Sequence, residues 1–210
     1  MTQLLIATTN KHKFQEVCRI FSECGLTGWE PVPLSAFPFY EAPEEDGATF
    51  GENAVIKAAH AAAELGMMTL ADDSGLAVDA LDGAPGIYSA RYADDESEGH
   101  DDAANRRKLL REMADVPEEK RGAAFICAAA LADPKGEAVF IEGRCEGIIA
   151  REEVGENGFG YDCLFYLPQF KATMAQISED EKNAVSHRGK AMRKMAALLT
   201  DIKNDTEQHK

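Results

Sequence analysis

Two adjacent carboxylates, Asp72 and Asp73, are the sharpest chemical feature of the sequence. They follow the apolar run 67–71 and precede Ser74 and Gly75. Two carboxylates at the end of an apolar strand are costly to bury unless they bind a cation or hold a proton. Because neighbouring strand residues point to opposite sides, we expect only one of them to face a given cleft. The competing interpretation is an Asx turn that Gly75 closes.

A second group of acidic residues, at positions 44–46, leads into the start of an expected helix. Lys57 lies one turn inside that helix. A divalent cation such as Mg²⁺ binds oxygen ligands of this kind. Glu52 and Asn53 also suit a helix N-terminus that has no functional role. An acidic loop in an acidic chain is often only a solvated surface, so the sequence leaves both interpretations open.

The segment 8–13, which reads TTNKHK, lies between an expected strand and an expected helix. Free backbone N–H groups at a helix start, together with Lys11 and Lys13, would form an anion site. The segment contains no glycine, unlike the glycine-rich phosphate loop. An ordinary helix cap with two solvated lysines is the alternative.

The segment 158–162 alternates small and aromatic residues as Gly-Phe-Gly-Tyr-Asp. This pattern leaves room for a flat ring, such as a nucleobase, beside Phe159 and Tyr161. The alternative is a glycine-kinked strand with ordinary core aromatics.

Hydrogen-bond donors gather near the end of the chain, at a second expected helix start. They are Lys182, Ser186, His187 and Arg188. A single histidine at such a place is usually a cap or a surface residue.

Taken together, the five segments supply cations for phosphates, carboxylates for a divalent metal and an aromatic pocket with donors for a base. This combination predicts a nucleoside triphosphate site.

Helices around a mixed sheet would position these segments, because apolar residues recur with helical spacing in some parts of the chain and form short unbroken runs in others. We expect one domain over residues 1–203 and a frayed tail over 204–210. The expected strands are 3–8, 67–71, 123–132 and 138–149, with a further apolar run at 76–81. The expected helices are Thr9 or Asn10 to Gly25, about 52 to a Gly66 cap, about 100–113 and about 186–202. We expect loops at 35–50 and 93–101.

The composition excludes several classes of protein. With 22 basic and 37 acidic residues in 210, the net charge is −15, which repels polyphosphate chains and argues against nucleic acid polymers as partners. The apolar stretch Leu4–Ala7 is too short for a signal peptide or a membrane span, so we expect a cytoplasmic protein without a membrane partner. Five cysteines without a C-x-x-C pair predict reduced thiols, with neither a disulfide framework nor a zinc site.

A set of motifs in order along residues 8–188 resembles the inosine/xanthosine triphosphate pyrophosphatase family. The motifs are Thr8-Thr9-Asn10-x-x-Lys13, Phe50-x-Glu52-Asn53-Ala54-x-x-Lys57-Ala58, Ala71-Asp72-Asp73-Ser74-Gly75-Leu76, Gly83-Ala84-Pro85-Gly86-Ile87-Tyr88-Ser89-Ala90-Arg91, Phe159-Gly160-Tyr161-Asp162 and Ser186-His187-Arg188. The set is far more specific than any single motif.

This resemblance implies a homodimeric, Mg²⁺-dependent enzyme that hydrolyses deaminated purine nucleoside triphosphates (ITP, dITP, XTP) to the monophosphate and pyrophosphate. It implies an α/β fold with a long curved mixed β-sheet, flanking helices and two lobes around a central nucleotide cleft. Carried over by position, Glu45 and Asp73 serve the metal and Asp73 is also the base. The implied nucleotide contacts are Thr8, Thr9, Asn10, Lys11, His12, Lys13, Lys57, Ser74, Phe159, Gly160, Tyr161, Asp162, Lys182, His187 and Arg188.

Base discrimination is expected in the aromatic segment and the donors after it. The aromatic segment would stack on the purine, and a cationic group among Lys182, His187 and Arg188 would donate to the 6-oxo oxygen, where ATP presents an amino donor instead.

Two residues depart from the family pattern. Thr9 stands where a glycine is usual, and Cys163 replaces the usual proline. The first would alter how closely the loop backbone approaches phosphate, and the second would loosen the aromatic segment.

Two rival functions are a nucleotide sensor without catalysis and a pyrophosphatase without base selectivity. The presence of both Glu45 and Asp73 argues against the sensor.

Overall fold

The computed structural model describes residues 1–95 and 101–208. In chain order its main elements are β1 (Thr2–Ile6), α1 (Lys11–Glu23), β2 (Trp29–Pro33), α2 (Phe50–Leu65), β3 (Thr69–Val78), α3 (Asp102–Glu112), β4 (Gly122–Ala132), β5 (Ala138–Ile149), β6 (Phe165–Leu167), β7 (Ala172–Thr173), α4 (Glu179–Val185) and α5 (His187–Gln208). Short 3-10 segments lie at Leu34–Ala36, Asp79–Leu81, Gly86–Arg91 and Glu118–Lys120.

The strands form a mixed sheet with the order β2-β1-β3-β4-β5-β6-β7. Strand β1 runs parallel to β2 and to β3, with Leu5 opposite Val32 on one side and Thr69 on the other. Strands β5 and β6, and then β6 and β7, pair antiparallel. The predicted α/β class with a mixed sheet and flanking helices is therefore confirmed.

The chain divides into two compact units. Unit 1 contains Met1–Asp73, Cys127–Gly143 and His187–Lys210, and unit 2 contains Ser74–Ile126 and Arg144–Ser186. Strands β3, β4 and β5 each contribute residues to both units. The single domain over 1–203 and the central cleft stay predictions.

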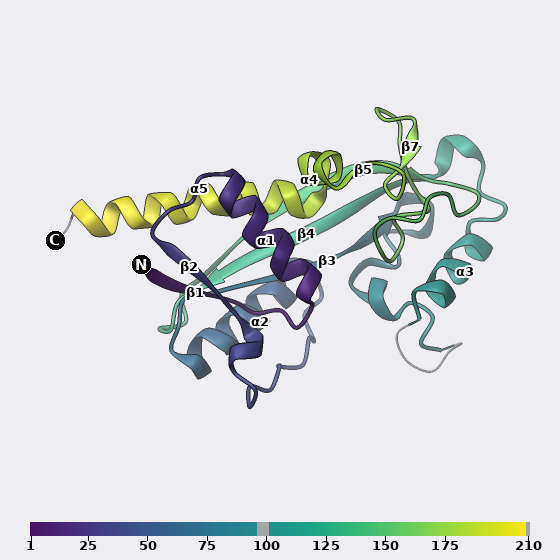
Figure 1. The fold of residues 1–210 in the computed structure, drawn as a ribbon. Coiled ribbons are helices and arrows are strands. Elements are labelled where there is room, and N and C mark those ends of the chain that lie inside the picture. Colours follow the sequence, from purple (N-terminus) through teal and green to yellow (C-terminus); the bar gives the residue numbers. More distant parts are fainter. Residues whose placement is uncertain (96–100, 209–210) are drawn as a thin grey trace. The chain divides into compact units, whose positions relative to one another are not determined.

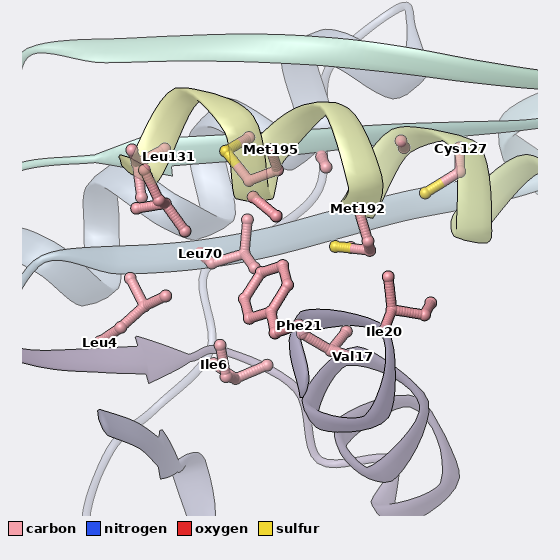
Figure 2. Close-up of a cluster of buried hydrophobic side chains, with 14 residues drawn as sticks. Leu4, Ile6, Val17, Ile20, Phe21, Leu70, Cys127, Leu131, Met192 and Met195 are labelled. Atoms are coloured by element: carbon pink, nitrogen blue, oxygen red, sulfur yellow. The ribbon is translucent and has the colours of Figure 1, made fainter. Parts of the chain in front are cut away.

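Unit 1 has its core on the side of the strands that α1 and α5 cover, whereas α2 covers the other side (Figure 1). The alternation of side chains along β1 explains both faces. Leu4 and Ile6 belong to the cluster beneath α1 and α5, in which Phe21, Leu70 and other apolar side chains are at most 3% exposed (Figure 2). Leu5 points the other way and packs with Ala61 of α2.

The ends of the unit 1 helices follow from local side-chain chemistry. Asn10 caps α1, and its side chain accepts from the backbone N–H groups of His12 and Lys13. Thr49 caps α2 in the same way, so α2 begins at Phe50 rather than near residue 52. At the other end Gly66 has φ +66°, a left-handed conformation that favours glycine, and it ends α2 as expected.

Unit 2 has a core of its own. Its buried cluster joins Leu76 of β3, Leu109 of α3, Phe125 of β4 and Phe165 of β6. Helix α3 begins at Asp102 with Asp101 as its cap, and its expected start near residue 100 lies outside the described residues. The expected loop 93–101 also lies partly outside them.

Three expectations about local structure need correction. Strand β3 does not end before Asp72, because it runs without a break from Thr69 to Val78, so the Asx turn at Gly75 is excluded. Residues 158–162 form turns and bends rather than a kinked strand. Helix α5 continues to Gln208 instead of ending at residue 202, while the frayed tail stays a prediction.

None of the helices within residues 1–95 and 101–208 combines the length and apolar character that crossing a lipid bilayer requires.

A buried ion-pair network ties α1 and α5 to the middle of β3. Asp72 Oδ2 accepts from Arg188 Nη2 at 3.2 Å, from Arg188 Nε at 3.3 Å and from Lys13 Nζ at 3.2 Å. Arg188 Nη1 also donates to Glu16 Oε2 at 3.0 Å. Burial by itself disfavours the charged guanidinium, but Asp72 and Glu16 outweigh burial and raise the pKa of Arg188. A cation buried in this way depends on its carboxylate partners.

The substitution Asp72→Asn should therefore destabilise the protein. The side chain keeps its shape but loses the charge that compensates Arg188, and we expect unfolding free energy to fall by about 3 kcal/mol. Urea unfolding followed by circular dichroism measures the change. Glu23→Gln is the matched control because the Arg19–Glu23 pair is exposed, and it should cost less than about 1 kcal/mol. Equal losses in the two variants would contradict the role of Asp72.

Candidate functional site

Asp73 lies on the face of β3 opposite Asp72 and meets side chains of α2 and of the loop before it. Lys57 Nζ donates to Asp73 Oδ1 at 3.1 Å and to Glu45 Oε2 at 2.9 Å. Asn53 Nδ2 lies 3.4 Å from Asp73 Oδ2, and Asn53 Oδ1 accepts from the backbone of Gly47 at 2.9 Å. The structure thus brings two separate acidic segments of the sequence together around one ammonium group.

Burial and charge compete within this group. Burial raises the pKa of Asp73, and the attraction of Lys57 together with hydrogen bonds from Lys57 and Asn53 offsets only part of that effect, so the pKa lies above its ordinary value. For Lys57, burial by itself lowers the pKa, but Asp73 and Glu45 outweigh it and the pKa is raised. Asp73 is therefore a stronger base than an exposed aspartate and stays paired with a protonated lysine.

The donor set at this position suits a hard divalent cation. One carboxylate oxygen from Glu45 and one from Asp73 already lie within 3.1 Å of a single positive group, Lys57 Nζ. Mg²⁺ commonly takes one or two carboxylates and completes its coordination with water and substrate phosphate. Within residues 1–95 and 101–208, no three His, Cys, Asp or Glu side chains gather as a complete metal site. Glu45 and Asp73 would supply two of the oxygen ligands that such an ion takes.

The turn 8–13 is partly occupied by its own cap. Asn10 Oδ1 accepts from the backbone of His12 at 2.9 Å and of Lys13 at 3.2 Å, so these two N–H groups are not free for an anion. Thr8 Oγ1 accepts from the backbone of Asn10 at 3.2 Å. The capping interpretation is confirmed for Asn10. Lys13 is not simply solvated, because its ammonium group contacts Asp72. The neighbouring side chains of Thr9, Lys11 and His12 are exposed.

In unit 2 a compact turn presents an aromatic ring and a lysine. Asp162 Oδ2 accepts from Lys182 Nζ at 2.6 Å and from the backbone of Phe159 at 2.9 Å. The Lys182 ammonium also lies 5.0 Å from the centre of the Phe159 ring, a distance suited to a cation–π interaction. The Phe159 ring is half exposed, whereas Asp162 is buried.

Tyr161 has a different role from Phe159. Its ring is buried, and its hydroxyl donates to the backbone carbonyl of Ser89 at 2.9 Å. Burial raises the pKa of the hydroxyl well above its ordinary value, so Tyr161 remains a neutral donor. Tyr161 therefore anchors the turn to the 3-10 segment Gly86–Arg91, and only Phe159 presents a ring to solvent.

Some residues of this arrangement were not anticipated. Asp102 and Arg106 of α3 bind both backbone polar groups of Gly160, since Asp102 Oδ2 accepts from its N–H at 3.0 Å and Arg106 Nη1 donates to its carbonyl at 3.2 Å. Nothing local in the sequence indicates these contacts. Glu16 was also missed, although its spacing of three from Lys13 places both on one helix face.

The expected nucleotide contacts therefore fall into separate groups. In unit 1, Glu45, Lys57 and Asp73 meet, and Lys13 joins Arg188 at Asp72. In unit 2, the turn 159–162 meets Lys182. Within unit 1 Arg188 binds Asp72 and Glu16, and within unit 2 Lys182 binds Asp162, so their expected joint role as base donors stays a prediction. His187 is buried at the start of α5, and Ser74 follows Asp73 on β3.

Comparison with known proteins agrees with this fold and these motifs. A model of the Ham1 family matches residues 4–198. A dITP/XTP pyrophosphatase of Desulforamulus reducens is 48% identical over 200 residues, which cover 95% of this chain and 96% of that protein. One of Bacillus cereus is also 48% identical, with 96% of each chain covered.

Solved structures give the same result. A HAM1 protein from Coxiella burnetii superposes with a TM-score of 0.86 and 38% identity, covering 96% of this chain and 100% of that one. A nucleoside-triphosphatase / dITP/XTP pyrophosphatase from Mycobacterium abscessus has a TM-score of 0.76 and 46% identity, with coverage of 94% and 99%. The family model and these relatives span nearly the whole chain, and the protein therefore belongs to the Ham1 family.

Proposed function

We propose that this protein is a nucleoside triphosphate pyrophosphatase that hydrolyses deaminated purine nucleotides, ITP, dITP and XTP, to the monophosphate and pyrophosphate. The observation that carries the proposal is the convergence of Glu45 and Asp73 on Lys57. This arrangement occurs in a chain whose relatives at 48% identity bear the name dITP/XTP pyrophosphatase.

The chemistry required is the attack of water on the α-phosphorus. The new bond joins the water oxygen to that phosphorus, and the bond to the bridging oxygen breaks, so that pyrophosphate leaves. Asp73 is the proposed base that takes the water proton, and its raised pKa makes it better suited to that task than an exposed aspartate. Lys13 and Lys57 are proposed to bind phosphate oxygens, where an ammonium group stabilises the charge on the leaving group.

Mg²⁺ is the proposed cofactor, and Glu45 and Asp73 are the residues that would hold it. When bound, the ion would neutralise phosphate charge. Asn53 supports the same position, because it contacts Asp73 and also ties Gly47 of the preceding loop to α2. The remaining residues of the turn 8–13 and Ser74 are proposed to complete the contacts to phosphate.

The half-exposed Phe159 ring is proposed to stack on the purine, and Lys182 to donate to its 6-oxo oxygen. ATP presents an amino donor at that position, so a lysine donor would face another donor. His187 and Gly160 are proposed as further contacts. Tyr161, Asp162 and Arg188 are proposed as contacts too, and in the structure their polar groups bind Ser89, Lys182 and Glu16.

The partners proposed are small purine nucleotides and a second copy of the chain in a homodimer, in the cytoplasm. The net charge of −15 supports a free nucleotide rather than a nucleic acid polymer, because the cations that could bind phosphate are few and local. The resemblance of the motifs supports the homodimer.

Purified protein incubated with ITP and Mg²⁺ should release IMP and pyrophosphate. Phosphorus NMR distinguishes these products from IDP and orthophosphate. The same incubation with XTP, GTP and ATP tests selectivity, and removal of Mg²⁺ with EDTA should abolish turnover. IDP and orthophosphate as first products would contradict the proposal. Tight binding of ITP without turnover would favour the sensor, and equal kcat/KM values for all four nucleotides would favour the unselective pyrophosphatase.

Asp73→Asn should lower kcat for ITP on the order of 100-fold or more, because the amide keeps the shape of the side chain but cannot accept the water proton. Steady-state kinetics with saturating Mg²⁺ measure the loss. Asp115→Asn alters an exposed aspartate of unit 2 and should leave kcat unchanged. Wild-type turnover by Asp73→Asn would refute the assignment of the base.

A further inference from the structure

The ammonium group of Lys57 lies between the two carboxylates that are proposed to hold a divalent cation. Its Nζ atom is 2.9 Å from Glu45 Oε2 and 3.1 Å from Asp73 Oδ1. The side chains of Lys57 and Asp73 are 18% and 16% exposed, and that of Glu45 is 36% exposed. Both ion pairs are therefore partly shielded from water, where opposite charges attract each other more strongly than at an open surface.

The Asp73 oxygen that Lys57 contacts is also the one left for a cation. The other oxygen, Oδ2, lies 3.4 Å from Asn53 Nδ2, which is a hydrogen-bond donor. An ion such as Mg²⁺ bound to Asp73 Oδ1 and Glu45 Oε2 would lie about 2.1 Å from each oxygen. Lys57 Nζ contacts the same two oxygens, and two positive charges so close together repel each other. Lys57 and the ion therefore compete for this position.

The loop that carries Glu45 is fixed to the start of α2 by contacts that do not involve Lys57. The backbone N–H of Gly47 donates to Asn53 Oδ1 at 2.9 Å. The backbone N–H of Ala48 donates to Glu52 Oε2 at 2.6 Å. Loss of the lysine charge should therefore leave this loop in place.

Asp73 is held in the same independent way, because it is part of the buried strand β3. The ammonium group of Lys57, by contrast, ends a flexible stem of four carbons and can move while α2 stays in place. Of the three charged groups, the ammonium is thus the one that can leave without a change in the fold.

We propose that Lys57 is an internal competitor for the divalent cation, and that its ammonium group has to leave Glu45 and Asp73 before these carboxylates can hold the ion. The ion pairs lower the affinity of the nucleotide-free protein for the ion, because only the fraction of molecules in which Lys57 has moved can bind it. The displaced ammonium group is then available for a phosphate oxygen. The inference rests on the proposed function in taking the cation to be the Mg²⁺ of that reaction.

The experiment titrates the nucleotide-free protein with Mn²⁺ and follows free Mn²⁺ by electron paramagnetic resonance. Mn²⁺ suits the same oxygen ligands as Mg²⁺. Lys57→Met keeps an unbranched side chain that favours a helix but removes the charge. We expect this variant to lower the Kd of Mn²⁺ roughly tenfold, which corresponds to a competitor in place in about nine of ten molecules. An unchanged or a raised Kd would overturn the proposal.

Lys13→Met is the matched control, because it removes the same charge from the other face of β3. Lys13 Nζ contacts Asp72 Oδ2 at 3.2 Å, and its side chain is 23% exposed. Its effect on the Kd of Mn²⁺ should stay below about threefold, as for a change of net charge without competition. Lys57→Arg keeps the charge and should leave the Kd near the wild-type value. A gain of affinity in either control as large as that in Lys57→Met would count against competition by the Lys57 charge and overturn the proposal.

Asp73→Asn in the Lys57→Met background shows where the ion binds. The amide removes one of the two carboxylates, so the gain of affinity should disappear. A gain that survives this substitution would place the ion elsewhere and overturn the proposal.

NMR of the wild-type protein tests the same point if Lys57→Met does not fold. Saturation of the nucleotide-free protein with Mg²⁺ should shift the Cε and Nζ signals of Lys57 toward those of a solvated lysine. The corresponding signals of Lys13 should stay where they are. Lys57 signals that do not move, or that move no more than those of Lys13, would overturn the proposal.

The proposed function is judged separately by hydrolysis of ITP, because the Mn²⁺ titration contains no nucleotide. Release of pyrophosphate from ITP by the wild-type protein, together with an unchanged Kd of Mn²⁺ in Lys57→Met, would refute only the competition. Tighter binding of Mn²⁺ by Lys57→Met, together with no hydrolysis of ITP by the wild-type protein, would support the competition and refute the pyrophosphatase.

Discussion

The arrangement of unit 1 depends on two adjacent carboxylates that point to opposite faces of one buried strand. On one face Asp72 compensates Arg188 and Lys13, which hold α5 and α1 against β3. On the other face Asp73 meets Lys57 of α2 and, through it, Glu45. Because a strand places neighbouring side chains on opposite faces, one dipeptide serves both layers of helices. Of two residues adjacent in sequence, one therefore belongs to a buried ion pair and the other to the candidate site.

Unit 2 follows a similar principle with a single carboxylate. Asp162 is buried, and it binds Lys182 and the backbone amide of Phe159, whose ring is half exposed. In both units a buried acid fixes a basic side chain whose freedom would otherwise be large. The residues that could touch a ligand, Lys13, Lys57, Phe159 and Lys182, are thus held by residues that are more buried or lie deeper in the fold.

Overall charge and local charge act in opposite senses in this protein. The chain carries a net charge of −15, yet three lysines are among the candidate phosphate and base contacts, and each of them is paired with an acid. Long-range repulsion disfavours a polyanion that must cover a large surface, while a small nucleotide needs only a few local donors. This contrast supports a free nucleotide as the proposed substrate. In the proposed function, Lys57 would have to bind phosphate oxygens either in addition to Asp73 or in place of it.

Local patterns in the sequence are enough to predict the α/β class, most helices, strands β4 and β5 and the set of motifs, because periodicity and capping chemistry depend on neighbouring residues. It could not show that β3 continues through Asp72 and Asp73, since charged residues ordinarily end an apolar strand and only cations from distant helices make them tolerable there. It also named Arg188 and Lys182 as donors without showing the partner of either. That Arg188 compensates Asp72 and that Lys182 contacts Asp162 follows from the fold alone, since the free energy of a buried charge depends on which partners the fold brings within reach.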